Sequence, residues 1–157
     1  MDEWIMTQAA FDRLWSRVQG NAPTAPPPDE EAALRRFLDE TGQTLAFERQ
    51  LLCRSGRDRA AMLALCRATR SRLCRLRAAC FLLTGEVRTP PDACPVRSGY
   101  LADLRRDWLC AEKRAGEYRA EAQAVQDAKL RALYEELAGE EAAHADALRA
   151  VIGRCFG

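Results

Sequence analysis

The C-terminal part of the chain carries a stripe of residues with the period of an α-helix, and two members of the stripe are ionisable. Steps of three and four residues place these side chains on one helix face: Leu130, Tyr134, Leu137, Glu141, His144, Leu148 and Val151. A face this apolar is expected to be buried, and an unpaired carboxylate is costly to bury. We therefore expect Glu141 and His144, the chain's single histidine, to share a partner in the core. A metal ion is one such partner, because the two side chains lie one helical turn apart.

Helical signals continue through most of the chain after residue 28, and no segment alternates in the manner of a strand. Asp29 is expected to cap the first helix, Gly85 to end the second, and the prolines at 90, 91 and 95 to hold a loop over residues 86–98. Four helices are predicted, over residues 29–54, 57–83, 99–125 and 127–152. Two tight turns and one longer middle connection are typical of an all-α four-helix bundle.

The N-terminal residues 1–28 form a separate unit in this prediction, ahead of a bundle over residues 29–157. Residues 3–19 can form a short amphipathic helix, with Trp4, Phe11 and Trp15 on one face. A proline-rich, semi-rigid linker follows over residues 20–28. The helix is expected to contact the bundle, a second subunit or another partner, and a homodimer is one arrangement that would cover its tryptophans.

Composition excludes several classes of protein. The net charge of +1 favours neither nucleic acid nor an anionic membrane as a partner, and no apolar run is long enough to span a bilayer. The acidic start of the chain is unlike a signal peptide, which predicts a cytoplasmic protein. The seven cysteines include no C-x-x-C pair, so most are expected to be small buried side chains, with Cys94 the one most exposed.

The second half of the sequence resembles the rubrerythrin-like branch of the ferritin-like superfamily. The resemblance rests on Glu112-Lys113-Arg114-Ala115, on Tyr118, and on the run from Leu130 to Leu148 that contains Glu141-Ala142-Ala143-His144. In that family a glutamate on the third helix and a Glu-x-x-His on the fourth supply half of a di-iron site. The resemblance therefore implies Glu112, Glu141 and His144 as metal ligands. Glu112 also fits a core-facing stripe with the residues Leu101, Leu104, Trp108 and Ala115.

The family has an internal two-fold repeat, so the first half of the chain is expected to supply the remaining ligands. Glu40 precedes the turn at Ser55 by the same distance along the chain as Glu112 precedes Asp127, and Glu48 is a competitor on the apolar stripe. The second helix breaks the pattern, because the positions equivalent to Glu141 and His144 hold Thr69 and Arg72. If Arg72 reaches inward, it can pair with Glu112 or Glu141 and replace the charge of a metal.

Two classes of function follow from this incomplete ligand set. The first is a metal-binding protein with a mononuclear iron, manganese or zinc site, of use in iron or peroxide handling under oxidative stress. The second is a non-enzymatic bundle that has lost its metal and serves as a structural or interaction module. Tyr118 and Tyr134 either line the site or pack in the core. The arginine-rich second helix is expected to face acidic neighbours rather than nucleic acid.

Overall fold

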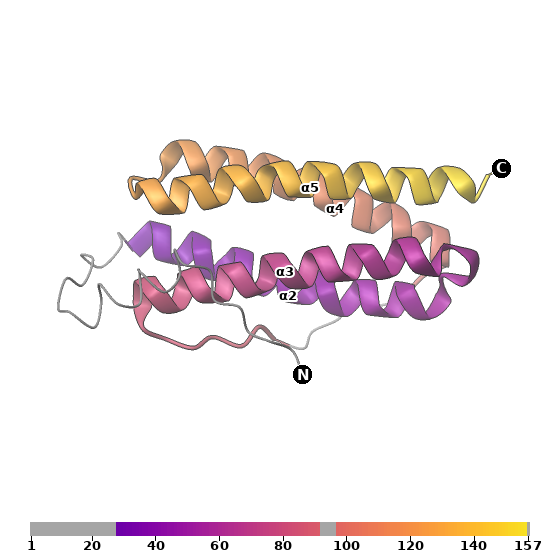
Figure 1. The fold of residues 1–157 in the computed structure, drawn as a ribbon, viewed down its shortest axis with the longest axis horizontal. Coiled ribbons are helices and arrows are strands. Elements are labelled where there is room, and N and C mark those ends of the chain that lie inside the picture. Colours follow the sequence, from indigo (N-terminus) through magenta and orange to yellow (C-terminus); the bar gives the residue numbers. More distant parts are fainter. Residues whose placement is uncertain (1–27, 92–96, 157) are drawn as a thin grey trace.

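The structure is a computed structural model that describes residues 28–91 and 97–156, and within these ranges the chain is helical with no strands. The elements are α2 (Pro28–Arg54), a short 3₁₀ turn η1 (Gly56–Asp58), α3 (Arg59–Thr84), α4 (Tyr100–Ala124) and α5 (Ala128–Arg154). The four α-helices are long and lie side by side (Figure 1). The all-α class and the four-helix bundle are thus confirmed. The N-terminal helix predicted over residues 3–19 and the loop cysteine Cys94 lie outside the described residues.

The helix boundaries follow from local signals in the sequence. The side chain of Asp127 accepts hydrogen bonds from the backbone N–H groups of Lys129 and Leu130, both at 2.8 Å, and caps the start of α5. Gly85 adopts φ 79° at the end of α3, a left-handed conformation that glycine adopts without steric cost. The expectation that Asp29 caps the first helix is wrong, because α2 already begins at Pro28; Asp29 lies in its acidic first turn.

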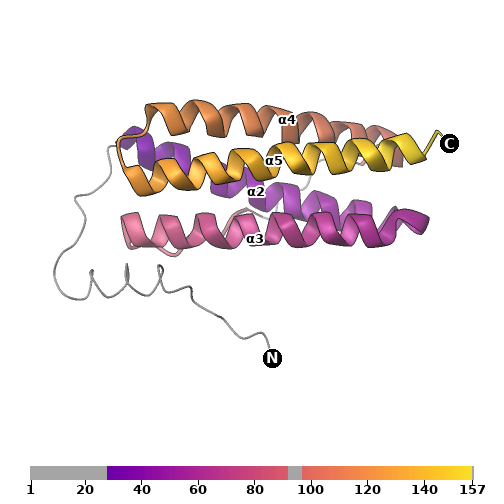
Figure 2. The same ribbon diagram turned by 45° about the horizontal axis from the view of Figure 1, so that its top comes forward.

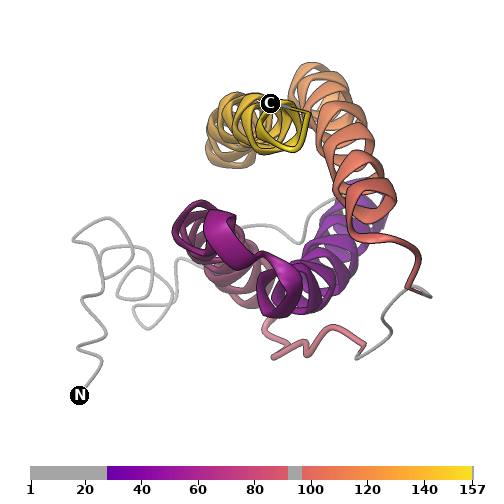
Figure 3. The ribbon, with the colours of Figure 1, turned by 90° about the vertical axis from the view of Figure 1, so that its right-hand side faces the viewer.

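The bundle consists of two helical hairpins, one laid over the other. Helices α2 and α3 pack closely as the first hairpin, and α4 and α5 as the second. Figure 2 shows the two hairpins as layers, and the end-on view of Figure 3 shows the four helices arranged around a common centre. The connection between the hairpins crosses α2, where a side chain on Gly42 would overlap with Pro90. Within the described residues, none of the helices combines the length and apolarity needed to cross a membrane.

The core has two apolar clusters with a polar layer between them. The first cluster centres on Phe37, Tyr118 and Tyr134, whose rings lie 4.2–5.9 Å apart. The second includes Met62 and Leu148 at the other end of the bundle. Between the clusters all four helices contribute buried polar residues: Thr44 and Glu48 from α2, Thr69 and Arg72 from α3, Asp107 and Arg114 from α4, and Glu141 and His144 from α5. Polar groups in the middle of a bundle need partners, so this layer is the natural place to look for a functional site.

Candidate functional site

Glu141 is the most heavily paired carboxylate of the polar layer. Arg114 donates from Nε to Oε1 at 3.1 Å and from Nη2 to Oε2 at 3.4 Å, a two-pronged contact. The Nε atom of Arg72 also lies 3.2 Å from Oε1, in ion-pair contact. Glu141 and Arg72 are each only 1% exposed, and Arg114 is nearly as buried. Both oxygens of Glu141 are therefore occupied by guanidinium groups from two other helices.

The charge of Glu141 favours the ionised form of Arg114. Burial by itself would lower the pKa of Arg114, but the adjacent, hydrogen-bonded Glu141 carboxylate raises that pKa above its ordinary value. Arg114 also donates from Nη1 to the hydroxyl of Thr44 at 2.9 Å. Its guanidinium is thus fixed in position by contacts with both α2 and α5.

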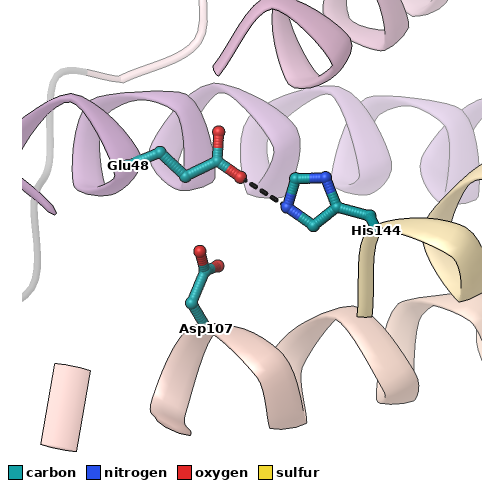
Figure 4. A group of neighbouring side chains, drawn as sticks. All are labelled: Glu48, Asp107 and His144. Carbon is teal, nitrogen blue, oxygen red and sulfur yellow. Dashed lines mark ion pairs between the residues drawn. The ribbon is translucent and has the colours of Figure 1, made fainter. Parts of the chain in front are cut away.

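His144 lies between Arg72 and Glu48. Nη2 of Arg72 is 3.1 Å from Nδ1 of His144, and Nε2 of His144 is 2.8 Å from Oε1 of Glu48 (Figure 4). A guanidinium has donors only, so Nδ1 must be the acceptor, which places the proton of a neutral imidazole on Nε2. The contact between Nε2 and Glu48 is close enough for an ion pair but lacks the alignment of a hydrogen bond. Nη2 of Arg72 also donates to Thr69, whose hydroxyl donates to Oε1 of Glu48, both at 2.9 Å.

Asp107 completes the layer opposite Glu48 and His144. Figure 4 shows its carboxyl group turned toward both. Ligand atoms of the three residues all lie within 4.8 Å of one another, and three of their buried atoms have no hydrogen-bond partner: Oε2 of Glu48, Oδ2 of Asp107 and Nε2 of His144. Burial, reinforced by the negative charge of Glu48, holds the pKa of Asp107 well above its ordinary value. Asp107 therefore keeps a proton more readily than an ordinary aspartate.

A groove of about 260 Å³ gives solvent a route to this layer. It runs between α2 and α4, and its buried lining residues are Thr44, Phe47, Asp107 and Arg114. The rim is mixed in charge, with Glu40 and Glu117 facing Lys113 and Arg106. Asp107 thus lies between the groove and the centre of the bundle.

Two of the predicted ligands do not reach the polar layer. The prediction that Glu112 faces the core is wrong, because its side chain is 43% exposed and pairs with Arg149 at 2.9 Å. Glu40 is half-buried at the rim of the groove, where it pairs with Arg36. The residues from the predicted set that meet are Glu48, Glu141, His144 and Arg72.

Arg72 does point inward, as its position beside the core stripe suggested. It reaches Glu141, not Glu112, because only Glu141 lies on the inner face of its helix. Whether its charge takes the place of a metal stays a prediction.

The polar layer contains two residues that the sequence pattern missed, Asp107 and Arg114. The predicted core stripe of this helix, with Leu101, Leu104, Trp108, Glu112 and Ala115, did not include them. Six of the residues that α4 buries recur at steps of three and four: Leu104, Asp107, Ala111, Arg114, Tyr118 and Ala122. The sequence signal that could have identified them is the spacing of Asp107 and Arg114, an acid and a base one heptad apart on this stripe.

The tyrosines and cysteines do not belong to the polar layer. Tyr118 and Tyr134 pack against Phe37 in the first apolar cluster, and burial raises the pKa of Tyr118 to about 12. Cys66 and Cys80 are buried, but Cys53, Cys74, Cys110 and Cys155 are exposed, and Cys110 lines the groove. The expectation that most cysteines are buried is therefore wrong for the described residues.

The raised pKa of Asp107 predicts a pH-dependent stability. The folded chain keeps a proton on Asp107 that the unfolded chain loses near pH 4, so stability falls as pH rises from about 4 toward the folded-state pKa. Asp107→Asn cannot lose this proton. We expect the free energy of unfolding of Asp107→Asn, relative to that of the wild type, to increase by up to about 1.4 kcal/mol for each unit by which the pH rises in this window. Urea unfolding from pH 4 to pH 8 measures the difference, with the exposed Glu112→Gln as control. A difference that is constant with pH would contradict the prediction.

Comparison with known protein families, with curated proteins and with solved structures finds no match for this chain.

Proposed function

We propose that this chain is a non-enzymatic, ferritin-like bundle that acts as a structural or interaction module, with arginine in place of a metal in its polar layer. The observation that supports this most directly is the position of Arg72. Its guanidinium contacts both Glu141 and His144, two of the three residues that the family resemblance marks as metal ligands. A cation supplied by the protein thus lies beside two of the expected ligands.

Charge balance supports the same conclusion. Three buried carboxyl groups, those of Glu48, Asp107 and Glu141, face two buried guanidinium groups, those of Arg72 and Arg114. One further positive charge neutralises the layer, and a proton on Asp107 supplies it. A divalent ion would bring one charge more than the layer needs, so the residues balance without a metal.

The hydrogen bond to His144 also opposes metal binding. A metal-bound histidine ordinarily donates its other ring N–H to an acceptor. Here Arg72, a donor, lies at Nδ1 of His144. Coordination through Nε2 would require a proton on Nδ1, facing the guanidinium, or displacement of Arg72. Both alternatives cost the ion-pair cluster one of its contacts.

A second candidate function is favoured by the unpaired atoms around Asp107. Oε2 of Glu48, Oδ2 of Asp107 and Nε2 of His144 are of the types that bind iron, manganese or zinc, and the groove offers an entry path. These three residues would hold a single divalent ion, which would supply a Lewis acid at the base of the groove. This set differs from the expected one: it contains His144 and Glu48, the predicted competitor of Glu40, but has Asp107 in place of Glu112 and Glu141.

Metal content separates the two candidates. We expect the full chain, purified without chelators, to contain no stoichiometric iron, manganese or zinc by elemental analysis. We also expect no stabilisation by added metal. At a free metal concentration a hundred times the dissociation constant, a real site would raise the free energy of unfolding by about 2.7 kcal/mol. Stoichiometric metal that is lost in Asp107→Asn and retained in Glu112→Ala would establish the second candidate and overturn the first.

A further inference from the structure

The outward face of α3 is basic and has no acidic residue to balance it. Arg59, Arg67, Arg70 and Arg77 are all exposed, and within the described part of the chain none of the four forms an ion pair. No aspartate or glutamate occurs from Arg59 to Thr84. This corrects the expectation that the arginines of this helix face acidic neighbours, which holds only for Arg72 and Arg75. Four uncompensated charges on one helix stand out in a chain whose net charge is +1.

Apart from Leu63, the exposed side chains between these arginines are short, and together with Arg67 they follow a regular spacing. Exposed residues recur at alternating steps of four and three along the outer face: Ala60, Ala64, Arg67, Ser71, Cys74 and Ala78. This is the 3.5-residue period by which one helix packs along another. Over these residues the seam is about 27 Å long, at 1.5 Å per residue. Arg70 and Arg77 each precede a seam residue, the position from which side chains pair across a helix–helix contact.

We propose that the outer face of α3 binds an acidic amphipathic helix of a partner protein. Large apolar side chains of that helix would lie over the short residues of the seam, and its glutamates or aspartates would pair with Arg70 and Arg77. The proposal rests on the function proposed above, because it names the kind of partner that such an interaction module would bind.

The face fits a helix better than a nucleic acid. Binding to the phosphates of a nucleic acid requires only positive charge, whereas this face combines positive charge with a seam at the helix-packing period. No aromatic residue that could stack on a base occurs between Arg59 and Ala78. The spacing of the short residues therefore distinguishes the two kinds of partner.

The test uses the full chain and a fluorescent synthetic peptide of about three heptads, with leucine at the seam positions and glutamate at the flanking ones. Its control is a scrambled peptide of the same composition. We expect the patterned peptide to bind, and the double variant Arg70→Glu/Arg77→Glu to weaken binding by at least about tenfold. Arg119→Glu reverses a charge on the exposed surface of α4 and should leave binding unchanged. Circular dichroism checks that each variant is folded.

Three results would overturn the proposal. The scrambled peptide could bind as tightly as the patterned one, which would show that binding depends on the composition of the peptide and not on its helical pattern. The double variant could bind as well as the wild type. A duplex DNA of similar length could bind more tightly than the peptide and lose its affinity in the double variant, which would identify a nucleic-acid surface. None of these binding measurements depends on the metal content of the protein. The failure of this proposal can therefore be distinguished from the failure of the proposed function.

Discussion

Arg72→Met is expected to lower the free energy of unfolding by about 3–5 kcal/mol, because it removes one partner of a buried ion pair. Methionine approximates the length of the arginine but supplies neither charge nor donors. The substitution leaves Nδ1 of His144 without its donor and takes one of two cations from Glu141. Urea unfolding at pH 7 measures the loss as a shift of the midpoint at constant slope.

The matched control is Arg67→Met, on the same helix but on its exposed face. It should change stability by no more than about 0.5 kcal/mol. If Arg72→Met were equally mild, the inward guanidinium would not be the cation that the layer depends on.

The same variant tests whether Arg72 replaces the charge of a metal. Without its guanidinium, one positive charge and the donor at Nδ1 of His144 are gone. Added Zn²⁺ or Mn²⁺ should then stabilise Arg72→Met more than it stabilises the wild type. If added metal stabilised the wild type and Arg72→Met equally, the guanidinium of Arg72 would not take the place of a metal ion.

The fold could be predicted from the sequence because its signals are local. The stripe on α5 is buried at each predicted position, and the ends of α3 and α5 follow from Gly85 and Asp127. Such signals depend on residues within one helix, so they need no knowledge of the neighbouring helices.

The site could be predicted only in part, because its partners come from different helices. Glu141 and His144 stood out as polar residues on an apolar stripe, and Glu48 was recognised in the same way. Asp107 and Arg114 did not, because a charged residue is ordinarily assigned to the solvent. Arg114 pairs with Glu141 and Asp107 lies beside Glu48 and His144 across the bundle, relations that helical periodicity within α4 does not contain. The ferritin-like resemblance added to the error, since it directed attention to Glu112.

Replacing Glu141 is expected to have a comparably large effect, because two buried guanidinium groups depend on it. Glu141→Leu leaves Arg72 and Arg114 without their shared carboxylate, which should cost at least about 3–5 kcal/mol.

The informative comparison is the triple variant Arg72→Met/Arg114→Met/Glu141→Leu, which replaces the whole ion-pair cluster by apolar side chains of similar size. Such replacements are often neutral or stabilising, since no buried charge is left alone. We therefore expect the triple variant to be more stable than Glu141→Leu alone. Its loss of unfolding free energy should be far smaller than the sum of the losses in the three single variants. Urea unfolding of the wild type, the three single variants and the triple variant measures the coupling. If the three losses simply add, the arginines and Glu141 act independently, and the polar layer is not a single unit that holds the two hairpins together.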